Sequence, residues 1–320
     1  MNPTITSGGP AIDTHDLTKR FGQTEVLHEI NLAVPEGAIY ALVGPNGAGK
    51  TTMIKLLMNI LRPTSGSAQV LGLETHEVAG EVFNRIAYVS ENQEMPEAMT
   101  VTAMLEYMRP FYPRWDRELE RQLVRQFDLP MERKLKHLSR GMKMKAAFAS
   151  SLAYRPSLIV LDEPFTGLDP LVRDELIESL LERAPETTIF LSSHDLAEIE
   201  SFASHVGYLE EGRMLFSEEM SVLADRFREV TITLAAPSPL PRKLPTAWLL
   251  PETTDCVVRF VLSEYRGEES EHEVAAVFPG ARDVAWEAMP LRSIFLAIAK
   301  TGRTQNHAAQ IAAGGRRVGA

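Results

Sequence analysis

The chain has 320 residues, 44% of them apolar, a formal net charge of −10 and a single cysteine. An acidic balance argues against a dedicated nucleic-acid binder, which usually shows a basic face, and one cysteine excludes an internal disulfide and favours a reducing compartment. The first ten residues lack the parts of a secretory signal, and no run of eighteen apolar residues occurs, so the sequence predicts no membrane span.

Residues 1–10 form a polar leader, and from Ile12 to about Ala41 short apolar stretches alternate with turn residues, which predicts several strands. The two later runs Leu158–Leu161 and Thr188–Ser192 are short and mainly apolar, which is typical of strands buried on both faces. The elements expected after residue 50 are helix over Thr51–Leu61, strand near Ser67–Leu71 and Ile86–Ser90, mostly helix over 100–155, strand over Leu158–Leu161, helix over Asp174–Arg183, strand over Thr188–Ser192 and helix over Leu196–Phe202. This alternation predicts an α/β layer with parallel strands.

The pattern changes after about Asp225. Val230–Leu234 and Cys256–Leu262 alternate like strands, with a Pro-rich linker or exposed loop over 237–245 between them. A strand near Val284–Trp286 and a helix over Leu291–Lys300 complete a small α+β unit. The Gly-, Ala- and Arg-rich end from residue 301 is expected to be a frayed tail.

The most specific motif is the stretch Gly-Pro-Asn-Gly-Ala-Gly-Lys-Thr over residues 44–51, between an apolar strand and a helix. Glycines allow consecutive backbone N–H groups to curl around an anion, and the helix that follows points its positive end at the phosphates. Lys50 adds a mobile charge for the β- and γ-phosphates, and the hydroxyl of Thr51 is placed to bind Mg²⁺. The candidate nucleotide-binding residues are Gly44, Asn46, Gly47, Ala48, Gly49, Lys50, Thr51 and Thr52.

Two adjacent carboxylates, Asp162 and Glu163, follow the apolar run Leu158–Leu161. A buried strand can hold a carboxylate steady beside a phosphate loop. Asp162 is therefore predicted to bind Mg²⁺, directly or through water, and Glu163 to polarise the attacking water as general base.

Between these motifs lies Leu-Ser-Arg-Gly-Met over residues 138–142, which resembles the signature loop Leu-Ser-Gly-Gly-Gln of the ATP-binding cassette (ABC) family. In that family the loop opens a helix and binds the γ-phosphate held by the opposite protomer. The resemblance implies this role for Ser139 and Gly141. Arg140 and Met142 depart from the pattern, and Arg140 is expected to add positive charge near a phosphate.

Other positions follow the same resemblance. Phe21 lies where the family stacks an aromatic ring on adenine, the alternative being a core aromatic. Asp169, after Gly167, resembles the loop that crosses the dimer interface, and His194 resembles the histidine that contacts the γ-phosphate. Glu91 stands where the family usually has a Gln that approaches Mg²⁺ and the attacking water, with Gln93 as the other candidate.

The resemblance implies an α/β, RecA-like P-loop ABC nucleotide-binding domain over residues 11–222, with an antiparallel β part and a helical subdomain at about 92–155. A C-terminal accessory α+β domain follows over 223–300, and a flexible tail over 301–320. It also implies two MgATP molecules held in a homodimer, or in a pair with a related ATP-binding subunit. An integral membrane permease is the expected partner, on the inner, cytoplasmic face of the cell membrane, and no nucleic acid is expected.

The Ser-Arg-Gly-Met form of the signature, with Lys143 and Lys145 after it, is similar to subunits of ABC-2 type exporters, as is the closing helix with its Phe295-Leu296 pair. The alternative class is a soluble ABC ATPase in translation or DNA maintenance. The presence of one cassette, with only 89 positions from Lys50 to Ser139, argues against that class. The C-terminal unit is interpreted as a structural extension, with a regulatory ligand-binding role as the alternative.

Overall fold

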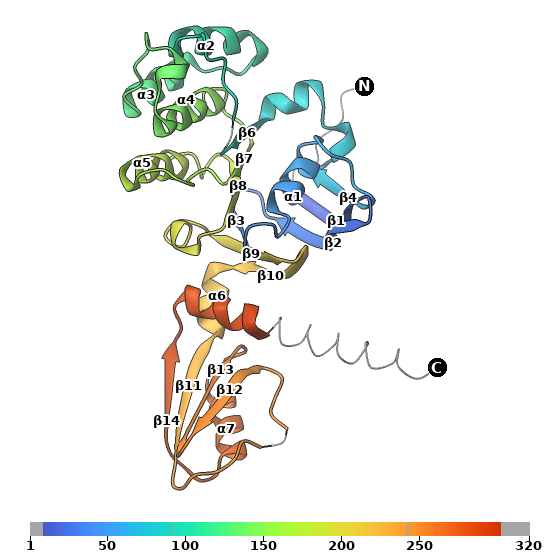
Figure 1. The fold of residues 1–320 in the computed structure, drawn as a ribbon, viewed down its shortest axis with the longest axis vertical. Helices are drawn as coiled ribbons and strands as arrows, with labels where there is room; N and C mark the ends of the chain where they lie inside the picture. Colours follow the sequence, from blue (N-terminus) through green and yellow to red (C-terminus); the bar gives the residue numbers. More distant parts are fainter. Residues whose placement is uncertain (1–8, 92, 242, 302–320) are drawn as a thin grey trace. The chain divides into compact units, whose positions relative to one another are not determined.

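The computed structural model describes residues 9–91, 93–241 and 243–301. The chain divides into two compact units, with the division between Ser217 and Glu218. The first unit contains two sheets and a group of helices, and the second contains one sheet with its own helices (Figure 1). Most of the predicted leader and tail lies outside the described residues.

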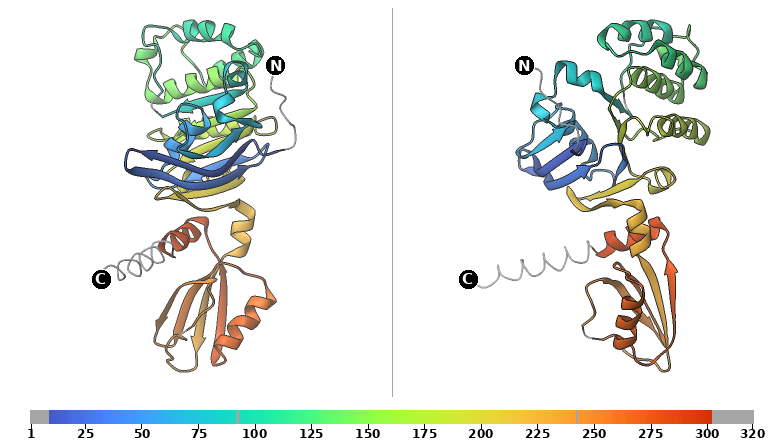
Figure 2. Two further views of the ribbon diagram at one scale, coloured as in Figure 1. Left: turned by 90° about the vertical axis from the view of Figure 1, so that its right-hand side faces the viewer. Right: turned by 180° about the vertical axis from the view of Figure 1, so that it is seen from behind.

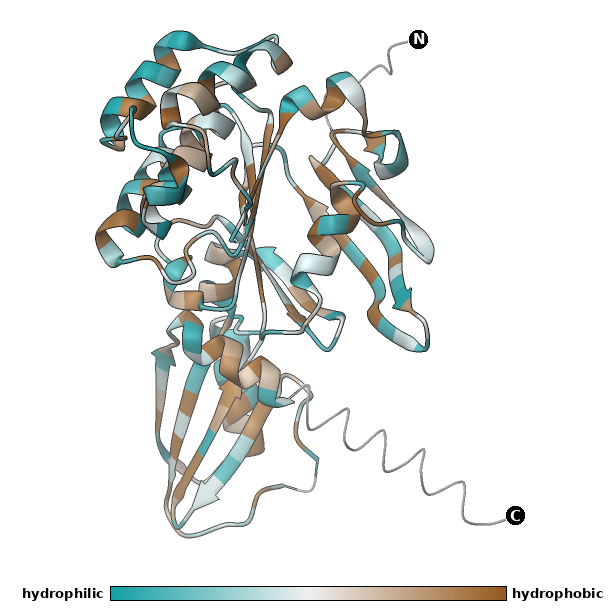
Figure 3. Cartoon of the chain, turned by 45° about the horizontal axis from the view of Figure 1, so that its top comes forward, coloured by the Kyte–Doolittle hydropathy of each residue, from teal (hydrophilic) through white to brown (hydrophobic). Residues whose placement is uncertain are grey.

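A six-stranded sheet forms the centre of the first unit, in the order β10-β9-β3-β8-β7-β6. Its strands are β3 (Ile39–Val43), β6 (Ile86–Ser90), β7 (Leu158–Asp162), β8 (Thr188–Ser193), β9 (His205–Glu210) and β10 (Arg213–Glu219). Strands β6, β7, β8, β3 and β9 pair in parallel. Every residue of β3, β7 and β8 is buried, as expected for strands of a sheet that is covered on both faces. Brown, apolar segments run through the middle of the first unit in Figure 3.

The register of this sheet aligns the carboxyl ends of four strands. Ser90 pairs with Asp162, Asp162 with Ser192, and Val43 with Ser193. Parallel strands end at the same edge, so the loops that follow them start side by side. This is the edge of an open α/β sheet where ligands bind.

A second sheet of the first unit is antiparallel, in the order β2-β1-β4-β5. It consists of β1 (Ile12–Phe21), β2 (Thr24–Val34), β4 (Ser65–Val70) and β5 (Leu73–Glu74). These strands share one hydrophobic core with helix α1 (Lys50–Leu57) and the central sheet, through residues such as Leu17, Met53 and Phe190. Figure 2 shows the strands (blue) apart from the helical group (green).

The helical group consists of α2 (Val101–Met108), α3 (Arg117–Gln126) and α4 (Arg140–Leu152), and α5 (Pro170–Leu181) follows β7. Short 3-10 turns are η1 (Thr75–Glu77), η2 (Gly80–Arg85), η3 (Arg109–Phe111), η4 (Leu135–His137) and η5 (Leu196–Glu198). The helical subdomain expected from the sequence is therefore present.

Two predicted helices are shorter than expected. The helix predicted over Thr51–Leu61 ends at Leu57, and Asn59 then adopts φ +54°, a left-handed conformation that ends a helix. The helix predicted over Leu196–Phe202 is wrong beyond the three-residue turn η5. The chain must turn there because β9 begins at His205, and the backbone N–H of Ser204 already donates to the carbonyl oxygen of Ile39 in β3.

The first complete element of the second unit is α6 (Met220–Arg226), which follows the last two residues of β10. The unit contains an antiparallel sheet in the order β12-β13-β11-β14. Its strands are β11 (Arg228–Leu234), β12 (Trp248–Thr254), β13 (Val257–Leu262) and β14 (Ala281–Ala288), with helix α7 (Glu268–Val277) and helical residues 291–301. The second unit has its own hydrophobic core, in which the ring of Trp248 stacks on that of Phe260 with 4.2 Å between the centroids. The sequence analysis missed α6, β12 and α7.

Candidate functional site

The phosphate loop, residues 44–51, runs from the end of β3 into the first turn of α1 and borders a pocket of about 360 Å³. The residues that line the pocket are Val26, Asn46, Gly47, Ala48, Gly49, Lys50, Thr51, Thr52, Glu91 and Glu163. All of the predicted nucleotide-binding residues of the loop except Gly44 are among them. The pocket thus opens at the carboxyl edge of the central sheet.

The glycines of this loop are required for two different structural reasons. A Cβ on Gly44 would lie 2.0 Å from the backbone oxygen of Leu209, so the neighbouring strand β9 leaves no room for a side chain. Gly47 instead has open space but a φ of +82°, and Gly49 has a φ of +110° directly before α1. The loop therefore depends on glycine both for a close backbone approach and for left-handed turns.

Lys50 is buried, and its ammonium group has three polar partners. It donates to the carbonyl oxygens of Gly44 at 2.7 Å and Pro45 at 3.2 Å, and it lies 3.1 Å from Oε1 of Glu163. A lysine has three N–H donors. A phosphate oxygen that takes a hydrogen bond from Lys50 must therefore replace one of these partners.

Asp162 and Thr51, two of the three predicted Mg²⁺ ligands, are in contact. Oδ1 of Asp162 accepts hydrogen bonds from the hydroxyls of Thr51 at 3.1 Å and Ser192 at 2.7 Å. Glu91 is close by, since its backbone N–H donates to the carbonyl oxygen of Asp162 at 2.9 Å. The side-chain oxygens of Asp162, Thr51 and Glu91 fit Mg²⁺, which usually takes one or two protein carboxylates together with phosphate oxygens.

Glu163 follows β7 with a φ of +51°, and its carboxylate lies in a network of polar groups. Its Oε2 accepts a hydrogen bond from the hydroxyl of Thr166 at 3.1 Å and lies 2.7 Å from Nδ1 of His194. Burial raises the pKa of Glu163, but the hydrogen bonds and charges of His194 and Lys50 outweigh it and hold that pKa below its ordinary value. The hydrogen bond to Glu163 raises the pKa of His194 in turn. Glu163 is thus an ionised hydrogen-bond acceptor at neutral pH.

Seven predicted site residues do not line this pocket. Gly44, Asp162 and His194 contact residues that do, namely Lys50, Thr51 and Glu163. The other four are Phe21, Ser139, Gly141 and Asp169. Phe21 ends β1 with 47% of its surface exposed and with Nζ of Lys19 5.0 Å from its ring centroid, which excludes a core role. Ser139 caps α4 by accepting from the N–H of Met142 at 3.2 Å, and Asp169 caps α5 in the same way. Gly141, in the first turn of α4, faces the side chain of Val172.

The sequence analysis missed Ser192 and Thr166. The hydroxyl of Ser192 donates to Asp162 and also accepts from the backbone N–H of Glu163 at 3.0 Å, so it holds both acids. The sequence signal was its place at the end of a predicted strand. That signal became specific only once β8 was known to lie next to β7.

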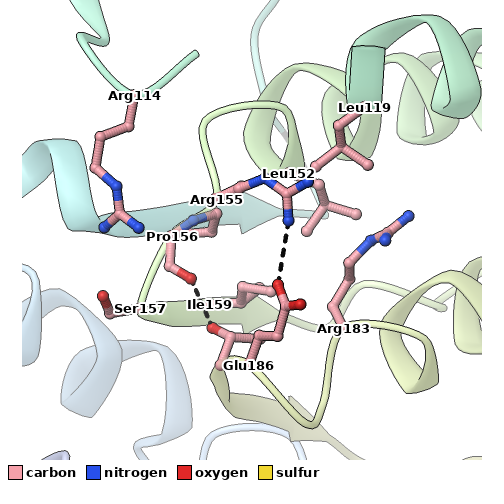
Figure 4. A pocket seen from close by; sticks show the side chains of 10 residues that line it. Arg114, Leu119, Leu152, Arg155, Pro156, Ser157, Ile159, Arg183 and Glu186 are labelled. Atoms are coloured by element: carbon pink, nitrogen blue, oxygen red, sulfur yellow. Dashed lines mark hydrogen bonds and ion pairs between the residues drawn. The ribbon is translucent and has the colours of Figure 1, made fainter. Parts of the chain in front are cut away.

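A smaller pocket lies at the opposite edge of the sheet, where Ser157 precedes β7 and Thr187 precedes β8. Arg114, Arg155 and Arg183 line it, and Arg155 pairs with Glu186 at 3.2 Å (Figure 4). The predicted chemistry is therefore concentrated at the other edge, in the pocket of the phosphate loop.

Comparison with known proteins agrees with this geometry. The family model for ABC transporters matches residues 27–166. The bacitracin transport ATP-binding protein BcrA of Enterococcus faecalis is 33% identical over 224 residues, which cover 69% of this chain and 73% of that protein. The chain belongs to the ATP-binding subunits of ABC transporters. As a member of this family it is an ATPase, which binds ATP and hydrolyses it to ADP and phosphate to power transport.

One further relative and one solved structure agree with this assignment to the ABC transporter family. The daunorubicin/doxorubicin resistance ATP-binding protein DrrA of Streptomyces peucetius is 34% identical, and the match covers 64% of each chain. A solved ATP-binding subunit of an ABC transporter is 29% identical with a TM-score of 0.62, and the match covers 67% of this chain and 92% of that one. The predicted P-loop fold is confirmed, and the alternative of a translation or DNA-maintenance ATPase is not favoured. Within the described residues, the longest apolar helices are still too short or too polar to span a membrane.

Proposed function

We propose that two ATP-binding chains close on two MgATP molecules and drive a separate membrane permease of the ABC-2 exporter type. The observation that carries this proposal is the division of the predicted site within one chain. The pocket holds the phosphate loop, Glu163 and Glu91, whereas Ser139, Gly141 and Asp169 do not line it. A second chain, identical or related, would supply those three residues.

The residues of the predicted nucleotide site have separate roles in this proposal. Lys50 and the N–H groups at the start of α1 bind the phosphates, and the ring of Phe21 stacks on adenine. Thr51 and Asp162, with Glu91 near them, would hold Mg²⁺, which supplies positive charge to neutralise the phosphates during transfer. The contact of Thr51 with Asp162 at 3.1 Å supports this assignment.

Glu163 acts as general base on the attacking water. Its ionised carboxylate accepts the hydrogen bond of the water, and His194 holds the carboxylate on one side. Lys50 neutralises it on the other side until a phosphate draws the ammonium away. Nucleotide binding would thereby free one oxygen of Glu163 for the water.

Export is supported by the relatives, which are named for bacitracin transport and for daunorubicin and doxorubicin resistance. The helical subdomain would contact the permease, which places the chain on the inner face of the cell membrane. The C-terminal α+β unit is assigned a structural role, because every residue of the nucleotide pocket belongs to the first unit. Recovery of a membrane protein with the chain after mild detergent extraction tests the permease partner, and repeated capture without one would remove this part of the proposal.

The decisive experiment is light scattering during size exclusion of the Glu163→Gln chain with and without MgATP. We expect ATP hydrolysis to fall by about 10²- to 10⁴-fold, since a general base contributes that much. The mass should rise from 35.6 kDa to twice that value on adding MgATP. Lys50→Ala, which weakens nucleotide binding, should stay at the lower mass. A Glu163→Gln chain that binds MgATP and remains monomeric would contradict the dimer.

A further inference from the structure

We propose that Arg140 acts within its own chain as the positioning residue for Glu91, and not as a phosphate contact for the opposite protomer. This inference rests on the proposed function in one respect, namely that Glu91 faces the bound nucleotide. It replaces the expectation from the signature-loop resemblance, which placed the charge of Arg140 near a phosphate.

The first observation is a direct ion pair between two loops far apart in sequence. A terminal guanidinium nitrogen of Arg140 donates to Oε1 of Glu91 at 2.7 Å. Glu91 is already tied to the strand of the catalytic acids, because its N–H donates to the carbonyl oxygen of Asp162. Arg140 therefore connects the first turn of α4 to the rim of the phosphate pocket.

The second observation is that the guanidinium group of Arg140 lies beside Gly167. A Cβ on Gly167 would lie 3.1 Å from Nη1 of Arg140 and 3.3 Å from its Cζ. The bare glycine backbone thus leaves room for the guanidinium. Ser139 caps the helix directly before Arg140, which fixes where the side chain starts. These contacts hold the side chain among three segments of the same chain.

The third observation concerns charge at the pocket. Asp162 has the hydroxyls of Thr51 and Ser192 as partners, and Glu163 has Lys50 and His194. Among the residues that the structure describes, the ion-pair partner of the Glu91 carboxylate is Arg140. Loss of Arg140 would leave the Glu91 carboxylate mobile, so that it is no longer held where it could bind Mg²⁺ and instead lies unneutralised beside the negatively charged phosphates of the nucleotide. Binding of the nucleotide should therefore weaken through Glu91.

A double-mutant cycle tests this coupling. The variants are Arg140→Gln, Glu91→Gln and the pair together, and the readout is the dissociation constant of a non-hydrolysable ATP analogue with Mg²⁺, at protein concentrations where the chain is monomeric. Arg140 and Glu91 are 45% and 30% exposed. For so exposed a pair we expect Arg140→Gln to weaken binding about two- to fivefold. In the Glu91→Gln background the same substitution should have no effect.

Two controls separate positioning from folding. Arg140→Lys keeps the charge and should restore most of the affinity, which a general packing role would not predict. Arg121→Gln removes another exposed arginine, paired with Glu118 on α3, and should leave binding unchanged.

Equal losses from Arg140→Gln in both backgrounds, or no loss in the monomer, would overturn the inference and favour a contact with the opposite protomer. A wild-type chain that binds no Mg²⁺-nucleotide would overturn the proposed function, and this inference with it. The two failures are therefore distinguishable.

Discussion

Glu163 lies between two basic groups, with Lys50 on one oxygen and His194 on the other. Both interactions lower the pKa of this carboxyl more than burial raises it. A low pKa makes Glu163 a weak base but ensures that it is ionised when a water arrives. Its catalytic strength must therefore depend on the release of Lys50 to the nucleotide.

The pair of Glu163 and His194 should make stability depend on pH. The raised pKa of His194 gives a contribution that is complete below its unfolded pKa of about 6.5 and is lost as pH rises through the folded pKa. The lowered pKa of Glu163 gives a contribution present above about pH 4.3 and lost as pH falls through the folded pKa. In urea unfolding without nucleotide, the wild type should therefore exceed His194→Gln in stability by more at about pH 6 than at about pH 8.5.

The control for this experiment is His76→Gln, at an exposed histidine outside the pocket. This variant removes a histidine without touching the pair of Glu163 and His194, so it gives the reference against which the pH dependence of His194→Gln is judged. A gap for His194→Gln that does not change with pH would show that the ion pair contributes nothing to the free energy of unfolding.

Gly44 should tolerate no side chain. The atom that a Cβ would meet at 2.0 Å is a backbone oxygen, that of Leu209, which cannot rotate away. Gly44→Ala should lower the free energy of unfolding by about 1–3 kcal/mol, the usual cost of overpacking, and also weaken ATP binding. Gly280→Ala is the control, because open space surrounds Gly280. Equal stability of the two variants in chemical denaturation would mean that the loop and β9 separate easily.

At the scale of elements, caps decide where the helices of the helical group start. The Asp116 carboxylate accepts from the N–H groups of Glu118 at 2.8 Å and Leu119 at 3.0 Å, and its other oxygen pairs with Arg155 at 2.9 Å. The sequence analysis described residues 100–155 only as mostly helical, since the periodic apolar positions do not mark the ends of helices.

Asp116→Ala should destabilise the protein by about 0.5–2 kcal/mol because the cap of α3 is lost. Asp116→Asn keeps a side-chain oxygen for the cap and removes only the ion pair with Arg155, so it should cost clearly less. Thermal unfolding of both variants compares the two contributions. If Asn costs as much as Ala, the ion pair and not the cap sets the stability of this end of α3.

At the scale of the whole molecule, the two units have separate hydrophobic cores. Trp248 is buried in the second core, stacked on Phe260. Trp248→Ala should destabilise the second unit by about 3–5 kcal/mol, because a large cavity forms. Hydrogen exchange should rise in β11–β14 and α7, while the affinity for ATP stays unchanged. A marked fall in ATP affinity would show that the second unit supports the nucleotide site.

The sequence by itself determined the features whose chemistry is contiguous along the chain. The phosphate loop, the Asp162-Glu163 pair and the strand Ile86–Ser90 were all predicted at their observed positions. Local spacing suffices for such features, because a strand-loop-helix unit and an apolar run each carry their own signal. The same locality explains the error over Leu196–Phe202, where the start of β9 prevents a helix that the local pattern favours.

Only the tertiary structure decided how the separate motifs interact. Ser192 holds Asp162 because β8 pairs with β7 in one register, and Lys50 meets Glu163 because β3 and β7 flank the same strand. Arg140 reaches Glu91 because the helical group brings the start of α4 to the end of β6. These contacts depend on strand order, register and helix placement, which arise from the packing of the whole unit and leave no mark in the spacing of residues.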